Sequence, residues 1–162
     1  QDIDPKDIIK KNLLNKNDYE KIHDISLMLY KRGNEIAKES GLILVDTKYE
    51  FGYDAKGEIT LIDEIHTPDS SRYFYLDTYE DLQTKGLKQK QLSKEFFREW
   101  LMENNFRGLE NQKIPNINDD VVKMVSNRYI ELYEKLIGEK FDFPSNNDII
   151  ERIQHNLKDF LK

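Results

Sequence analysis

The segment DTKYE at residues 46–50 places charged side chains at every second position. Asp46, Lys48 and Glu50 share one face if the segment is extended. Asp63 adds a carboxylate where the alternation of the next apolar segment requires an apolar side chain. Carboxylate oxygens suit Mg²⁺, and a nearby ammonium suits phosphate. The residue types therefore suit a cation and phosphate site, and they also suit a solvated cross-strand ion pair of little energetic value.

Two strands, 42–53 and 58–66, are expected to position these charges. The sequence DAKG between them is typical of a turn, so the strands should pair as an antiparallel hairpin. An even-length turn would make Lys48 and Asp63, Glu50 and Leu61, and Asp46 and Ile65 directly opposed pairs. Glu50 and Asp63 would then be the cation pair and Lys48 a phosphate contact. An odd-length loop would turn the second strand over and remove this arrangement.

The polar loop HTPDSSR follows the second strand. Asp69, Ser71 and Arg72 offer an acceptor, a hydroxyl and a guanidinium shaped for bidentate binding of phosphate or carboxylate. The alternative is an Asp/Ser turn that closes the strand. Lys94 and Arg98 are four residues apart, so they share one helix face and could cradle a phosphate, with solvated charge as the alternative.

The remaining elements follow from apolar periodicity and capping residues. Asn118 and Gly138 are expected to begin and end one helix, and Ser145 and Asp148 to begin the last. His66 lies near the charged segments and receives no role. The expected helices cover residues 5–15, 18–39, 93–103, 118–138 and 145–160, with residues 67–91 mostly irregular. Helices, a hairpin, a long loop and further helices indicate an α+β fold rather than repeating βαβ units.

Composition limits the class of protein. The chain has 162 residues, 38% hydrophobic and 35% charged, which fits one globular domain or two small ones. The net charge of −6 argues against non-specific nucleic-acid binding. The sequence has no cysteine, which excludes disulfides and thiolate zinc sites and is compatible with a reducing compartment. It contains no apolar run long enough to span a membrane and no signal-peptide core at its start, so we expect a cytoplasmic protein without a membrane partner.

Four blocks of the sequence resemble the C-terminal half of the SAICAR synthetase family, the phosphoribosylaminoimidazole-succinocarboxamide synthases of purine biosynthesis. The blocks are LILVDTKYEFG, GEITLIDEIHTPDSSRYF, LSKEFFREWL and SNRYIELYEKLIGEKF. The resemblance covers most of residues 20–143. It implies that residues 1–162 form a single C-terminal lobe with an ATP-grasp-like α+β fold, in which an antiparallel hairpin or sheet packs with several helices. The family's N-terminal nucleotide-binding lobe is then absent from this sequence.

The resemblance also implies the chemistry. ATP activates the carboxylate of carboxyaminoimidazole ribotide as an acyl phosphate, and the amine of L-aspartate attacks it to give the succinocarboxamide, ADP and phosphate. The implied cofactors are ATP and Mg²⁺, the implied partner is the missing N-terminal lobe, and the chain alone is expected to be inactive. Two alternatives remain open: a non-catalytic acidic α+β module that binds a partner, and another Mg²⁺-dependent phosphotransferase.

The same resemblance implies roles for individual residues. It implies that Glu50 and Asp63 bind the Mg²⁺ that accompanies ATP. It places Lys48 near the phosphates or the reacting carboxylate as a catalytic residue, with Asp46 supporting the same site. The residues implied to contact the ribotide or aspartate are Asp69, Ser71 and Arg72. The residues implied to hold the ribotide phosphate are Lys94 and Arg98.

Overall fold

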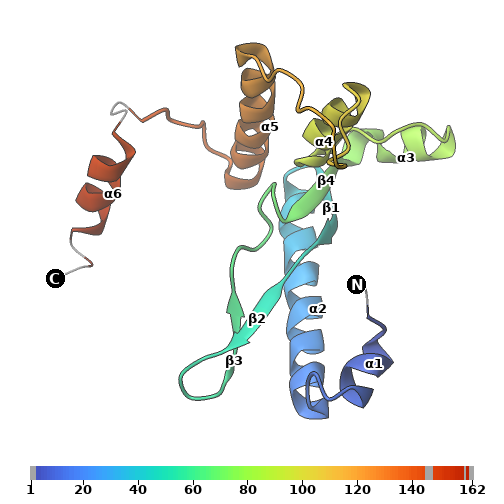
Figure 1. The fold of residues 1–162 in the computed structure, drawn as a ribbon, viewed down its shortest axis with the longest axis vertical. Helices are drawn as coiled ribbons and strands as arrows, with labels where there is room; N and C mark the ends of the chain where they lie inside the picture. Colours follow the sequence, from blue (N-terminus) through green and yellow to red (C-terminus); the bar gives the residue numbers. More distant parts are fainter. Residues whose placement is uncertain (1–2, 145–147, 159, 161–162) are drawn as a thin grey trace.

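The computed structural model describes residues 3–144, 148–158 and 160, and it shows an α+β fold (Figure 1). Helices and antiparallel strands are mixed along the chain, as the sequence predicts. In chain order the elements are α1 (Pro5–Lys10), α2 (Lys16–Glu39), β1 (Leu42–Thr47), β2 (Glu50–Tyr53), β3 (Ile59–Ile62), β4 (Ser71–Tyr75), α3 (Leu76–Thr84), β5 (Gln91–Leu92), α4 (Glu95–Glu103), α5 (Asp119–Ile137) and α6 (Ile149–Leu157).

The strands form two antiparallel sheets. One has the order β1-β4-β5, and the other consists of β2 and β3. The single strand expected over residues 42–53 is therefore wrong, because the chain leaves the first sheet at Lys48 and Tyr49 and enters the second at Glu50. Figure 1 shows β2 and β3 as a two-stranded arm that extends from the larger sheet beside α2. We call this pair the β2–β3 arm.

The turn of the β2–β3 arm has five residues, 54–58, rather than an even number. The side chain of Asp54 accepts the backbone N–H groups of Lys56 and Glu58, both at 2.8 Å. Gly57 has a φ of 79°, in the left-handed region that favours glycine. The odd length follows from this closed loop, in which one aspartate satisfies two backbone donors.

The register of the arm consequently differs by one residue from the even-turn expectation. Glu50 lies opposite Ile62, and Phe51 lies opposite Leu61. None of the expected opposed pairs forms within the arm: Lys48 and Asp63, Glu50 and Leu61, and Asp46 and Ile65.

The expectation that residues 67–91 are mostly irregular is also wrong. This segment contains β4, the central strand of the larger sheet, and α3, which follows directly. The sequence SRYFY is rich in aromatic residues, which favour strands, whereas the polar residues at its start are also typical of a loop.

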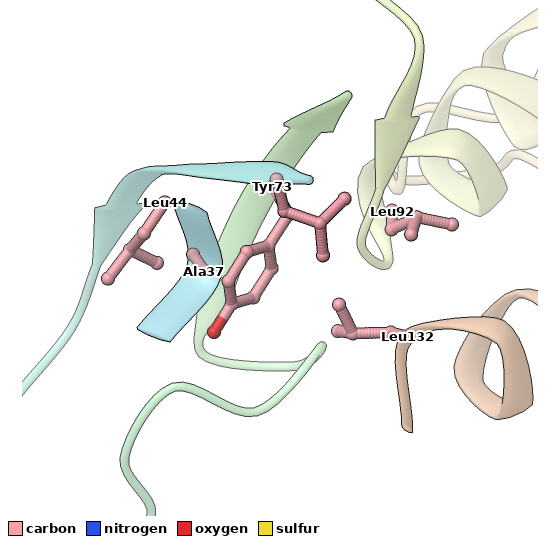
Figure 2. Packing of buried hydrophobic residues seen from close by; sticks show 6 residues of the cluster. Ala37, Leu44, Tyr73, Leu92 and Leu132 are labelled. Atoms are coloured by element: carbon pink, nitrogen blue, oxygen red, sulfur yellow. The ribbon is translucent and has the colours of Figure 1, made fainter. Parts of the chain in front are cut away.

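The core lies where α2, the larger sheet and α5 meet. Its fully or almost fully buried side chains are Ala37, Leu42, Leu44, Tyr73, Leu92 and Leu132. Figure 2 shows the ring of Tyr73 at the centre of this cluster, with Leu44 and Ala37 on one side and Leu92 and Leu132 on the other. The Tyr30 hydroxyl of α2 donates to the carbonyls of Leu44 and Val45, which fixes the helix to β1. This core holds the end of β1, where the charged residues begin.

The helices agree with the sequence to different degrees. The boundaries of α5 are confirmed, because Asn118 caps its first turn and Gly138 ends it with a φ of 77°. The helix expected over 5–15 stops at Lys10. The helix expected from Ser93 begins at Glu95, whose N–H donates to the Ser93 hydroxyl at 3.2 Å. No helix in the described parts of the chain has the length and apolar character needed to cross a membrane.

Helix α6 lies apart from the other elements (Figure 1). Asp148 caps it by accepting the N–H of Glu151 at 3.0 Å, whereas the expected contribution of Ser145 lies outside the described residues. Its apolar residues remain substantially exposed: Ile149, Ile150, Ile153, Leu157 and, beyond the helix, Phe160.

Candidate functional site

Lys48 lies between two carboxylates at the point where the two sheets separate. Its ammonium forms an ion pair with Glu50 and lies 3.5 Å from Oδ2 of Asp63. Asp63 directly follows β3 and has a φ of 64°, a left-handed conformation in which aspartate is one of the better tolerated residues. Asp63, which breaks the alternation of apolar residues in the sequence, therefore lies at a bend in the chain. Of the four residues that the sequence grouped, the structure brings Lys48, Glu50 and Asp63 together by a different geometry from the expected strand pairing, and it pairs Asp46 with Arg72 instead.

The Lys48 cluster, meaning Lys48, Glu50 and Asp63, is open to solvent. The Lys48 side chain is 59% exposed and both carboxylates are 45% exposed. The hydrogen bond to the Glu50 carboxylate raises the pKa of Lys48, and the charge of Asp63 acts in the same direction. Exposed pairs of this kind contribute little to stability. The arrangement therefore adds little to stability and is accessible to a ligand.

The donor set of the cluster fits a cation that also binds phosphate. Two carboxylates reach the same ammonium, so a cation of similar position could contact both. Within the parts of the chain that the structure describes, no three acidic or histidine side chains are placed to hold a metal ion by themselves. Mg²⁺ characteristically uses one or two carboxylates and completes its shell with water and phosphate oxygens.

Asp46 and Arg72 form a second charged pair across β1 and β4. They lie opposite each other after a β-bulge that leaves Val45 unpaired, and bulges commonly redirect side chains next to functional sites. Nε of Arg72 donates to both carboxylate oxygens of Asp46 at 3.0 Å, and Nη2 donates to one of them. These bonds lower the pKa of Asp46 and raise that of Arg72.

A hollow of about 180 Å³ lies beside this pair and carries most of the predicted substrate residues. Lys94 lies 2.9 Å from Asp69, and the buried Ser71 donates to the Thr47 hydroxyl at 2.9 Å. The lining residues are Asp46, Asp69, Ser70, Ser71, Arg72, Ser93, Lys94 and Glu95. We call this hollow the Arg72 pocket. A guanidinium and an ammonium at one small hollow suit a phosphate or carboxylate ligand.

The Lys48 cluster and the Arg72 pocket are directly linked through the backbone. The N–H of Lys48 donates to the carbonyl of Ser70 at 3.1 Å. Asp46 and Lys48 lie on either side of Thr47, whose hydroxyl accepts from Ser71. The two groups therefore form one continuous charged edge, which we treat as a single candidate site.

Arg98 lies outside this edge. Its guanidinium is 3.8 Å from Glu95, and its side chain lines a different hollow of about 330 Å³ together with Leu101, Met102 and Phe106. Lys94, at the N-cap position of α4, lines the Arg72 pocket, so the two cations border different hollows. A shared phosphate contact of Lys94 and Arg98 remains a prediction.

Two features were missed from the sequence. The Tyr49 hydroxyl lies 2.6 Å from Nε2 of His66, which links the break between the sheets to the loop after β3. A hollow of about 510 Å³ is lined by residues that include Tyr75, Lys90 and Arg128, with the Arg128 guanidinium 5.7 Å from the centre of the Phe96 ring. The alternation of residues 46–50 places Tyr49 on the face opposite Lys48 and Glu50, and nothing in the sequence identifies its partner.

Comparison with known proteins gives concordant matches. A family model described as SAICAR synthetase matches residues 1–115. A phosphoribosylaminoimidazole-succinocarboxamide synthase of Bacteroides thetaiotaomicron is 54% identical over 161 residues, which is 99% of this chain and 51% of that protein. The chain therefore spans about half the length of the curated relatives that it matches.

Solved structures show the same likeness. A SAICAR synthase from Saccharomyces cerevisiae complexed with SAICAR is 36% identical, with a TM-score of 0.70 over 88% of this chain and 45% of that one. A SAICAR synthetase (Type-2) in complex with ADP is 27% identical, with a TM-score of 0.59 over 87% of this chain and 46% of that one. The α+β fold described above is therefore the fold of these proteins over the matched region.

Proposed function

The chain belongs to the SAICAR synthetase family, and we propose that residues 1–162 form the C-terminal lobe of such a ligase. The proposed reaction of the whole enzyme has two steps. A carboxylate oxygen of carboxyaminoimidazole ribotide attacks the γ-phosphorus of ATP, and ADP leaves. The amine of L-aspartate then attacks the acyl carbon, phosphate leaves and the amine loses a proton, which gives the succinocarboxamide. The observation that carries the proposal is the charged edge formed by the Lys48 cluster and the Arg72 pocket.

Glu50 and Asp63 are the proposed ligands of the Mg²⁺ that accompanies ATP. Their carboxylates reach one position, now held by the Lys48 ammonium, and phosphate oxygens would supply the ligands that the chain lacks. The cation, when bound, would neutralise charge on the transferring phosphoryl group. Lys48, released from its carboxylate partners, would then be free to contact a phosphate or the reacting carboxylate.

The Arg72 pocket is the proposed contact for the ribotide or aspartate. Asp46 holds the Arg72 guanidinium through a bidentate interaction, which fixes the orientation of its remaining donors. Lys94 and the hydroxyl-bearing segment at Ser71 border the same hollow, and Asp69 pairs with Lys94. Charged ligands bind well where donors are already oriented, because little reorganisation is then needed. Arg98 is kept as a candidate contact for the ribotide phosphate from outside this pocket.

The other half of the enzyme would supply the opposite wall of the site. The curated relatives are about twice as long as this chain, and the side chains of the Lys48 cluster are exposed to solvent. We therefore expect the 162-residue chain alone to show no ATP-dependent formation of the succinocarboxamide. Normal turnover by the chain alone would overturn the proposal that it is one lobe of the enzyme.

The test uses a protein of full family length, made by joining this chain to the half that it lacks. Glu50→Gln and Asp63→Asn should each lower ATP- and aspartate-dependent product formation by a factor on the order of 10² or more, because each removes a charge placed at the transferring phosphoryl group. Glu58→Gln is the matched control, since Glu58 is an exposed carboxylate in the turn of the same arm and pairs with Lys21 at 3.2 Å.

The outcomes separate the alternatives. Near-normal activity of both variants would reject the cation site and favour a non-catalytic role for this edge. ATP consumption that requires neither aspartate nor the ribotide would indicate a different phosphotransferase. Loss of activity in Glu58→Gln as well would show that the arm is sensitive to any lost charge.

A further inference from the structure

Tyr49 links the Lys48 cluster to the protein interior. It lies between Lys48 and Glu50 in the sequence, and because the neighbours of a residue in extended chain point the other way, its half-buried ring faces inward while theirs are exposed. Its hydroxyl is 2.6 Å from Nε2 of His66, and the two rings meet edge to face at 5.6 Å. A displacement of Tyr49 would therefore also displace Lys48 and Glu50, the residues on either side of it.

His66 is itself held by contacts with α2 and β4. Its ring packs directly on the backbone of α2, where a Cβ added to Gly33 would lie 2.5 Å from Cε1 of His66. Its carbonyl accepts the Tyr73 hydroxyl of β4 at 2.7 Å. Its φ of 57° lies in the left-handed region, so the loop turns sharply at this residue. His66 is thus a fixed point to which Tyr49 is attached.

The loop that contains His66 also carries two acidic residues of the site. Asp63 lies three residues before His66, and Asp69 lies three residues after it. The hydrogen bond between Tyr49 and His66 therefore joins the segment that bears Lys48 and Glu50 to the loop that bears Asp63. Strand pairing already places Glu50 opposite Ile62, the neighbour of Asp63, but it does not include Lys48, which lies between the paired segments and bonds through its backbone N–H to Ser70.

We propose that His66 is a positioning residue that, through Tyr49, sets the separation between Lys48 and Asp63. The inference rests on the proposed function, because the cluster it positions is the proposed cation site. His66 has no described hydrogen bond or ion pair with the side chains of the Lys48 cluster. The role depends on a directional contact: the phenol and the imidazole nitrogen each supply one donor or acceptor to the other.

The test measures the cluster itself in the 162-residue chain and needs no substrate. In nuclear magnetic resonance spectra, a nuclear Overhauser cross-peak between the ε-methylene of Lys48 and the β-methylene of Asp63 reports their separation. We expect this cross-peak in the unchanged chain and its loss in both His66→Leu and Tyr49→Phe. His66→Gln should retain it, since the glutamine amide can take the place of Nε2.

The matched control is Tyr53→Phe. Tyr53 is a tyrosine of the same arm whose hydroxyl donates to Asp18 of α2 at 2.5 Å, so its loss weakens the arm without touching His66. The control should keep the cross-peak. Urea unfolding of every variant shows whether it is folded, and Tyr49→Phe, which removes one oxygen atom, gives the informative result if His66→Leu does not fold.

The result that overturns the inference is an unchanged cross-peak in a folded Tyr49→Phe chain, or its absence from the unchanged chain. A cross-peak lost equally in Tyr53→Phe would also reject it, since a general loosening of the arm would then be the cause. These outcomes are distinct from failure of the proposed function, which is decided by the activity of Glu50→Gln and Asp63→Asn in the full-length protein.

Discussion

Tyr73 offers a test of the interior that supports the site. Its side chain is 2% exposed, and its hydroxyl donates to the carbonyl of His66 at 2.7 Å. Burial raises the pKa of Tyr73 from 10.0 to about 12. Tyr73→Phe therefore removes a buried hydrogen bond and also removes a group that destabilises the fold in alkali. The two effects have opposite signs at different pH values.

The magnitudes predict a crossing of two stability curves. Near pH 7 the variant should be less stable by about 1 kcal/mol, the usual net value of one buried hydrogen bond. Because the folded pKa is raised, the contribution of Tyr73 to stability is complete below about pH 10 and is lost as the pH rises toward 12. At roughly 1.4 kcal/mol per pKa unit, the unchanged chain loses about 1.4 kcal/mol by about pH 11 from this residue. The variant should therefore equal the unchanged chain near pH 11 and exceed it above.

The assay is urea unfolding followed by circular dichroism at several pH values between 7 and 11.5. Tyr133→Phe is the control, because Tyr133 is 41% exposed on α5, and it should change stability by less than about 0.5 kcal/mol at pH 7. Deprotonation of lysines affects all chains alike and cancels in the difference. A difference between Tyr73→Phe and the unchanged chain that stays constant or widens with pH would refute the reasoning.

Two further predictions concern the core and the charged edge. Leu132→Ala should lower the free energy of unfolding, measured in urea, by about 2–5 kcal/mol, since Leu132 is 1% exposed and is the residue of α5 in the core cluster. A loss below about 1 kcal/mol would show that α5 contributes little to the stability of the core. Asp46→Asn should reduce the loss of stability in acid, because the hydrogen bonds from Arg72 lower the pKa of Asp46. The pair stabilises the fold at pH values above about 4, and this contribution is lost as the pH falls through the lowered pKa. A free energy of unfolding that falls in acid equally in the variant and the unchanged chain would contradict this.

Local signals in the sequence were sufficient for some elements. Asn118 and Gly138 bound α5 as predicted, because a side-chain cap and a left-handed glycine act within a few residues of the helix end. Asp148 caps α6 by the same kind of local bond, although the expected helix began three residues earlier, at Ser145. Such features need no knowledge of the rest of the fold, and the sequence therefore predicts them well.

The strands depended on partners that the sequence does not identify. Alternation over residues 42–53 is compatible with one long strand, but β1 ends at Thr47, where its pairing with β4 also ends. The residues of β4 lie in a segment that the sequence predicts to be irregular. The five-residue turn depends on two backbone bonds to one aspartate, which spacing alone does not reveal. Lys48 and Asp63 were grouped correctly although their expected register is wrong, because residues that flank a short arm lie near each other in either register.

The charges of the proposed site are paired with one another within the chain. Lys48 pairs with Glu50 and lies near Asp63, and the Arg72 and Lys94 side chains pair with aspartates of the same edge. Exposed pairs are weak, so a ligand can replace one partner at small cost, whereas an unpaired charge at a desolvated site would be expensive. In the proposed function, a cation takes the place of Lys48 between the two carboxylates, and the displaced ammonium gains a phosphate. Each binding step then exchanges one opposite charge for another, so a single lobe can keep its site intact before the second lobe and the substrates complete it.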